Sequence, residues 1–192
     1  MSAFDFNTAE VSGSGSSGPI PDGTVAPVIL HLRGLKTSSR DTRIQGLDLE
    51  YTVLEGPYKG RKAWKWAGIT GTGSDGHNKM ISITRSLIRG VLESAYGVKS
   101  TDDSPEAMAA RKINDWDDLD GIAFVARFGV EEGSDYVDAR SGENVKGKAK
   151  NTVTAVGVDE ADYAGFKPAK PKAAGIPKPP AGVKASTRPA WG

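Results

Sequence analysis

Positive charges and aromatic rings are concentrated in one short stretch of the chain, between Tyr58 and Trp66. This stretch contains four cations and three large rings. On an extended strand, Lys62, Trp64 and Trp66 would share one face, with the two indoles roughly 7 Å apart along the strand. Rings at this spacing can stack on two splayed bases, while neighbouring cations neutralise the phosphates. The stretch therefore predicts a surface for a ligand that is both aromatic and anionic.

A purely structural interpretation of the two indoles is also open. Trp64 and Trp66 could instead complete the hydrophobic core beside Leu49 and Tyr51, because aromatic side chains are a major part of most cores. The cations would then only keep the strand soluble. The charges in neighbouring segments bear on which interpretation is right.

Further cations flank this stretch in two predicted turns. The candidate binding residues from the turns and the strand are Arg33, Lys36, Arg40, Arg43, Tyr58, Lys59, Arg61, Lys62, Trp64, Lys65 and Trp66. Their cations could line one track for a phosphate backbone. Asp48 and Glu50 lie on the outward face of the preceding strand and would repel phosphate. We therefore expect binding through the loops and one edge of the sheet more than through its centre.

No other group of residues predicts a catalytic or metal site. The segment 71–76 reads GTGSDG, which has the spacing of a dinucleotide-binding loop, but no parallel strand with a terminal acid follows at the required distance. His77 near Asp75 lacks a strained nucleophile turn, and the acids at 115–120 form one solvated run. The chain has no Cys and two distant His residues. We expect no cofactor, no metal and no enzymatic activity.

Hydrophobic periodicity predicts the elements that position the rings. Alternating apolar residues predict strands at 24–36, 44–56, 121–131 and 151–158, and the strand with the two indoles follows the GPYKG turn. Helical spacing predicts a helix within 78–97 that ends at Gly97, and a shorter helix that begins after the N-cap Ser104. Pro27 predicts that the first strand lies at a sheet edge or near a bulge.

This order of elements, with a helix between the third and fourth of five strands, is that of an OB-fold. An OB-fold is a partly open barrel whose strand 2–3 face and connecting loops bind oligonucleotides or oligosaccharides. We expect a mainly β domain of this kind at 19–163. Residues 1–18 contain a Gly/Ser linker and residues 164–192 are rich in Lys, Pro and Ala, so both predict flexible tails.

The composition excludes several classes of protein. Hydrophobic residues make up 38% of the chain and charged residues 26%, as in soluble globular proteins. No apolar run approaches the roughly 18 residues of a membrane span, and the N-terminus lacks the features of a signal peptide, so we expect a cytoplasmic protein. The net charge of +1 is too small to indicate nucleic-acid binding by itself. That inference rests on local charge clusters.

Four segments also resemble, in order, a family of bacteriophage and prophage proteins that act as single-stranded-DNA-binding proteins in replication and recombination. They are IPDGT at 20–24, LDLEYTVLEGPYKGRKAW at 47–64, SDGHNKMISITRSLIRGVLESAYG at 74–97 and LDGIAFVARFGVE at 119–131. The resemblance covers about residues 19–160. It implies an OB-like barrel without cofactor or catalysis, and it carries over Tyr58, Lys59, Arg61, Lys62 and Trp64 by match of motif. The acidic tip that usually ends bacterial single-stranded-DNA-binding proteins is absent here.

The sequence therefore predicts a non-enzymatic protein that binds single-stranded DNA with little sequence preference, in the host cytoplasm. Phage replication or recombination proteins, and further copies of the chain, are candidate partners. The alternative is a virion or assembly protein whose β-domain contacts other proteins. An enzyme of DNA metabolism would need a carboxylate cluster for magnesium, and none has convincing spacing.

Overall fold

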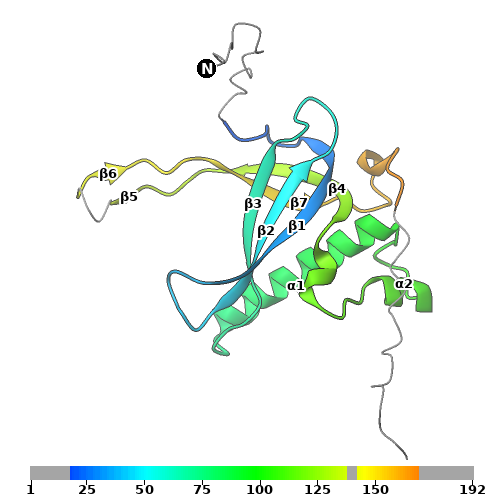
Figure 1. Cartoon of the computed structure of the whole chain (residues 1–192), viewed down its shortest axis with the longest axis horizontal. Helices are drawn as coiled ribbons and strands as arrows, with labels where there is room; N and C mark the ends of the chain where they lie inside the picture. Colours follow the sequence, from blue (N-terminus) through cyan, green and yellow to red (C-terminus); the bar gives the residue numbers. More distant parts are fainter. Residues whose placement is uncertain (1–17, 138–141, 169–192) are drawn as a thin grey trace, which may run out of the picture.

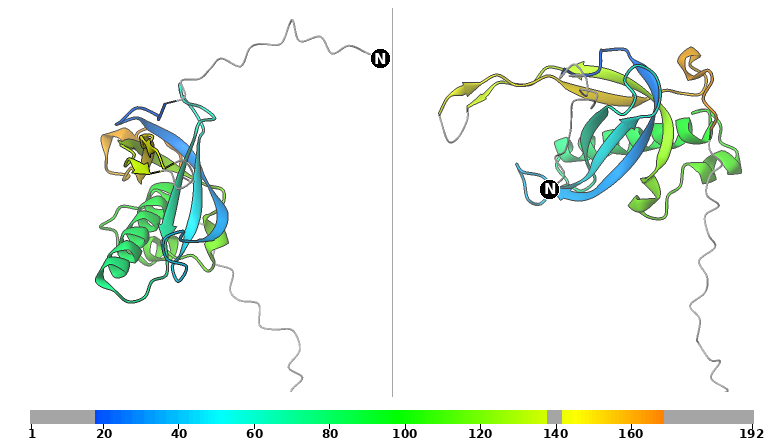
Figure 2. Two further views of the ribbon diagram at one scale, coloured as in Figure 1. Left: turned by 90° about the vertical axis from the view of Figure 1, so that its left-hand side faces the viewer. Right: turned by 45° about the horizontal axis from the view of Figure 1, so that its top comes forward.

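A five-stranded antiparallel sheet forms the centre of the protein. The computed structural model describes residues 18–137 and 142–168. The sheet contains β1 (Val25–Thr37), β2 (Gln45–Val53), β3 (Lys62–Gly68), β4 (Ile122–Glu131) and β7 (Lys150–Ala155), in the spatial order β3-β2-β1-β4-β7. Within the described residues no strand pairing joins β3 to β7. The sheet is curved but does not close into a barrel (Figures 1 and 2).

The predicted alternation in β2 is confirmed, and it sets the two faces of the sheet. Leu47, Leu49, Tyr51 and Val53 are all buried, whereas the residues between them are half-buried on the other face. This alternation is the period-2 pattern of a strand with one face toward the core. Polar side chains on the outer face of β2 can therefore contact side chains of the neighbouring strand β3.

Helix α1 (Asp75–Tyr96) covers the apolar face of the sheet. Its residues Val91, Leu92 and Ala95 belong to the same buried core as the strands. The side chain of Ser74 caps the first turn, and Gly97 ends the helix in a left-handed conformation with φ of 71°, which glycine adopts without strain. The Gly-rich segment before α1 is thus the connection between β3 and this helix.

The short second helix is also confirmed. Helix α2 (Pro105–Ala110) begins after Ser104, whose side chain accepts a hydrogen bond from the backbone N–H of Ala107. Two 3-10 turns, η1 (Trp116–Leu119) and η2 (Ala161–Tyr163), were not predicted. Among the described residues, no helix has the length and apolar character needed to cross a membrane.

Of the two positions that Pro27 indicated for the first strand, the sheet edge is wrong. β1 is the central strand, and Pro27 pairs with Val125 of β4. The carbonyl of Pro27 accepts from the N–H of Leu54, one residue past the end of β2. The N–H and the carbonyl of a strand residue point to the same side, so the N–H that Pro27 lacks would lie where the β1–β2 ladder ends. A bulge does occur in β1, but it lies between Leu32 and Gly34.

A narrow arm, also unpredicted, connects β4 to β7 and projects from the sheet (Figure 1). It includes the two-stranded ribbon of β5 (Tyr136–Val137) and β6 (Asn144–Val145). Gly133 and Gly147 lie where the two sides of the arm meet, and a β-carbon on Gly133 would come 2.5 Å from the carbonyl oxygen of Lys148. Most of the predicted tails lie outside the described residues.

Candidate nucleic-acid interface

Trp64 and Trp66 lie outside the core, on the outer side of β3. Trp64 is 54% exposed, and its Nε1–H donates to the Glu50 carboxylate at 2.9 Å. Trp66 is half-buried, and its Nε1–H donates to the backbone carbonyl of Lys36 at 3.1 Å. The side chains of Ala63 and Ala67 fill the core instead. The core interpretation of both indoles is therefore wrong.

Gly46 on β2 makes room for Trp66. A β-carbon on Gly46 would lie 2.5 Å from Cε2 and 2.7 Å from Cζ2 of the indole. Real β-carbons do not approach that closely, so only glycine allows the ring to lie against the β2 backbone here. Together with the hydrogen bond to Lys36, this contact holds the Trp66 ring in one orientation across β2 and β3.

Glu50 does not stand as a free negative charge at the centre of the surface. Its carboxylate accepts hydrogen bonds from Lys62 at 2.6 Å and from Arg33 at 3.4 Å, in addition to the one from Trp64. The hydrogen bonds from Lys62 and Trp64 lower the pKa of Glu50 below its usual value. The two cations offset its charge, so the expected repulsion of phosphate is reduced at this point. Asp48 makes no ion pair within the described residues.

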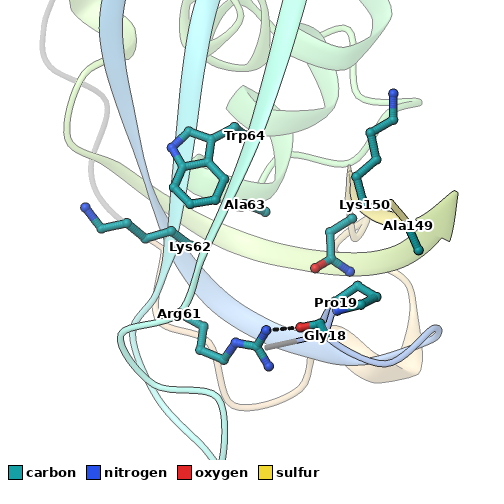
Figure 3. A pocket seen from close by; sticks show the side chains of 9 residues that line it. Gly18, Pro19, Arg61, Lys62, Ala63, Trp64, Ala149 and Lys150 are labelled. Atoms are coloured by element: carbon teal, nitrogen blue, oxygen red, sulfur yellow. Dashed lines mark hydrogen bonds between the residues drawn. The ribbon is translucent and has the colours of Figure 1, made fainter. Parts of the chain in front are cut away.

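Two adjoining hollows run along β3, and we call them together the β3 groove. The first, of about 360 Å³, lies between β3 and β7 and is lined by Gly18, Pro19, Arg61–Trp64 and Ala149–Asn151. The second, of about 590 Å³, is lined by Lys36–Arg40, Trp66 and Lys150. Figure 3 shows Lys62 and Trp64 on one side of the first hollow and Lys150 on the other. Lys150 lines both hollows and so joins them.

Some of the predicted cations meet at this groove. Lys36, near the end of β1, and Arg40, from the loop between β1 and β2, line the second hollow. Arg61 and Lys62, at the start of β3, line the first. Lys36 and Arg40 are exposed and make no ion pair within the described residues. These side chains are positioned to receive an anionic backbone along the groove.

Other predicted residues are placed differently. Arg43 is held by Asp41 through two hydrogen bonds of 2.9 and 2.8 Å, and this pairing lowers the pKa of Asp41 to about 2. Lys59 lies at the exposed turn before β3, and Lys65 lies on the opposite face of β3, with Ala63. None of these three cations lines the groove.

Tyr58 contributes to the site indirectly, through its contact with Arg61. It is half-buried and packs against the core, and the guanidinium of Arg61 lies over its ring, 5.9 Å from the centroid. A cation over an aromatic face is an attractive arrangement. Tyr58 therefore acts on Arg61 and offers no open ring for stacking.

β7 and the arm contribute cations to the groove that were not predicted. Lys150 lines both hollows, and Lys146 and Lys148 precede it as exposed residues in the segment KGKAK at 146–150. Alternating lysines separated by small residues were the available signal. Lys150 lies across the groove from Trp64 because the edge strand β7 curves toward β3. Local periodicity does not reveal this curvature.

The geometry provides one exposed ring, a second ring held in place beside it, and cations on both sides of a groove. This arrangement can bind a flexible anionic chain that carries planar groups. Among the residues that the structure describes, no group of three His, Asp or Glu side chains is placed to hold a metal ion. No protein-family model matches the chain, and no curated protein is significantly similar to it.

Proposed function

We propose that this protein is a non-enzymatic single-stranded-DNA-binding protein that holds its ligand in the β3 groove. The observation that carries the proposal is Trp64, an indole that is 54% exposed at the edge of a groove lined by Lys36, Arg40, Lys62 and Lys150. Exposing so large an apolar ring is unfavourable without a ligand, and its hydrogen bond to Glu50 fixes the ring at the surface.

The topology supports an OB-like assignment of this fold. The strand order β3-β2-β1-β4-β7, with α1 between β3 and β4, follows the order of a five-stranded OB barrel, and an open side between the third and fifth strands is compatible with it. In that fold the loop after the first strand and the loop between the last two strands border the ligand. Here the corresponding segments carry Arg40 and Lys150.

Binding would combine stacking with charge neutralisation. A base stacks on Trp64, and the next base meets the exposed part of Trp66, two residues along β3. Lys36, Arg40 and Lys150 neutralise the phosphates; Lys150 has only a long, exposed ion pair with Glu131 at 3.5 Å, whereas Lys62 is held by Glu50. Because every base has an aromatic face, stacking discriminates little between sequences. A duplex keeps its base faces stacked inside, so a single strand is the better ligand.

The biological setting follows from the same chemistry and from the resemblance of the sequence to phage proteins. A protein that covers exposed strands without catalysis would act during phage DNA replication or recombination, in the host cytoplasm. Replication or recombination proteins of the phage would then be its partners. A protein of virion assembly is the alternative if the groove binds no nucleic acid.

A titration with fluorescently labelled oligo-dT, followed by anisotropy at several salt concentrations, tests the proposal. Three phosphate contacts predict that log K falls with log salt with a slope of about −2, since each contact on a single strand contributes about −0.7. Unlabelled oligo-dT should displace the probe, and duplex DNA of the same length should displace it poorly. Absence of binding at low salt would contradict the proposal.

A further inference from the structure

The first described residues of the chain are clamped at the mouth of the β3 groove. The side chain of Asn151 on β7 accepts a hydrogen bond from the backbone N–H of Ile20 at 2.8 Å and donates one to its carbonyl at 2.7 Å. The Ile20 side chain is completely buried. Across the gap, the Arg61 guanidinium donates to the carbonyl of Gly18. The chain at 18–20 therefore bridges β3 and β7.

This clamp determines where the preceding segment starts. Gly18 and Pro19 line the first hollow together with Lys62, Trp64 and Lys150 (Figure 3). Residues 1–17, which lie outside the described residues, must therefore begin at the groove itself. Any contact between this segment and the groove is local and needs no closure over a long distance.

The composition of residues 1–17 complements the groove. The segment has two aromatic residues, Phe4 and Phe6, and two acids, Asp5 and Glu10, but neither Lys nor Arg. Aromatic rings and negative charge are the two features that the groove would bind in DNA. Two cations of the groove, Lys62 and Lys150, pair with Glu50 at 2.6 Å and with Glu131 at 3.5 Å, but their side chains remain 47% and 66% exposed and leave room for a second carboxylate.

The length of the linker is sufficient. Eleven residues lie between Phe6 and Gly18, and seven of them read VSGSGSS. A Gly/Ser-rich chain of this length spans about 19 Å on average, and a tethered segment reaches an effective concentration on the order of millimolar. Phe4 and Phe6 can therefore sample the surface of Trp64 frequently.

We propose that residues 4–10 dock in the β3 groove of the same molecule, with a Phe ring against Trp64 and the two acids near Lys62 and Lys150. The segment acts as an internal competitor that single-stranded DNA displaces. The docking stands on the clamp and on charge complementarity, whereas the competition rests on the proposed function. The competitor would lower nonspecific occupancy of the groove when single strands are scarce.

Paramagnetic relaxation tests the docking without DNA. The chain has no Cys, so Ser2→Cys provides a single site for a nitroxide label on the full-length protein. We expect the label to broaden the indole N–H signal of Trp64 more than that of Trp116. A tether alone already brings the label near the groove, so the decisive comparison is with a variant that removes the docking side chains. This combined variant carries Phe4→Ala, Asp5→Asn, Phe6→Ala and Glu10→Gln. It should show broadening reduced by at least about twofold.

The matched control replaces Ser12 and Ser14 with Ala, in the linker outside residues 4–10, and should leave the broadening unchanged. Equal broadening in the combined variant and the parent would overturn the docking. A mixture of spin-labelled and unlabelled protein separates the two remaining cases. If the broadening arises only between different molecules, the segment docks on a second copy, and docking within one molecule is wrong.

The competition has its own readout. The combined variant should bind oligo-dT about threefold to tenfold more tightly than the parent, since the fraction of open grooves rises. If oligo-dT binds both equally, the competitor role is wrong. If oligo-dT binds neither, the proposed function fails, while the broadening still decides whether the segment docks.

Discussion

The indole of Trp66 lies against Gly46, so close that a β-carbon on this glycine would come within 2.5 Å of the ring. This contact couples the start of β2 to the outer side of β3. It also fixes the second ring of the candidate site relative to Trp64. The orientation of the two indoles thus depends on one residue without a side chain.

Replacing Gly46 with Ala should displace the Trp66 ring. The variant loses the contact with β2 and the hydrogen bond to the Lys36 carbonyl, and overpacking of this kind reduces the free energy of unfolding by about 1–3 kcal/mol. Urea unfolding followed by circular dichroism measures the change. Gly76→Ala is the control, because a β-carbon there meets open space at the start of α1. Equal stability of the Gly46 variant and the parent would show that the ring can move at little cost.

The ion pairs of Glu50 predict a specific pH dependence of stability. Hydrogen bonds from Lys62 and Trp64 lower the pKa of Glu50 in the folded state below the usual value of 4.5. The stabilisation is therefore fully present above about pH 4.5 and is lost as the pH falls through the lower pKa of the folded state. Glu50→Gln should flatten the fall in unfolding free energy on acidification below pH 4.5.

Chemical denaturation at a series of acidic pH values measures this difference. Glu55→Gln, at an exposed residue of the next turn, is the matched control and should lose stability on acidification as the parent does. A Glu50→Gln variant with the same pH dependence as the parent would mean that the Lys62 pair contributes nothing.

The cations of the groove should differ in their effect on DNA binding. Lys36→Ala and Arg40→Ala each remove a charge that lines the groove, so each should weaken binding and reduce the salt slope by about 0.7. Arg43→Ala should change the slope little, because Asp41 already pairs with Arg43. Anisotropy titrations at several salt concentrations give the slopes. Arg85→Ala, on the exposed side of α1, controls for net charge, and an equal effect of all four changes would mean that binding is not localised to the groove.

Local patterns predicted the faces of the elements well. In β2 the alternation separated Leu49 and Tyr51, which are buried, from Glu50, which is not. Gly97 ended α1 as expected. These properties depend on neighbours within a few residues, which is the range over which strand and helix periodicity act.

Relationships between distant segments were not predicted. Pro27 indicated an edge or a bulge because it lacks an N–H, but its polar side faces Leu54, just past the end of β2, where the ladder needs no further donor. Glu93 of α1 carries a charge, yet it is buried, and Arg89 and Arg111 both donate to it at 2.7 Å. Each case depends on a partner that is remote in sequence.

The candidate site shows the same division. That Trp64 and Trp66 share one face follows from the period of β3. The outward direction of that face, the pairing of Arg43 with Asp41 and the position of Lys150 opposite Trp64 do not. The clamp of Ile20 by Asn151 joins residues 131 positions apart. No spacing in the sequence indicates it.

Trp64 is expected to contribute strongly to binding and little to stability. Its ring is 54% exposed, so Trp64→Ala removes mainly a stacking surface, which is worth about 1–3 kcal/mol per base. The binding free energy for oligo-dT should become weaker by about 1–3 kcal/mol, while the urea midpoint of unfolding stays close to that of the parent. A large loss of stability would instead assign Trp64 a structural role.

The most direct test of the account is the quenching of intrinsic Trp fluorescence by oligo-dT in the parent, in Trp64→Phe and in the control Trp116→Phe. We predict quenching that salt reverses in the parent and in the Trp116 variant, and loss of most of that quenching in the Trp64 variant. Equal quenching in the Trp64 variant and the parent, or no quenching of the parent at low salt, would contradict it.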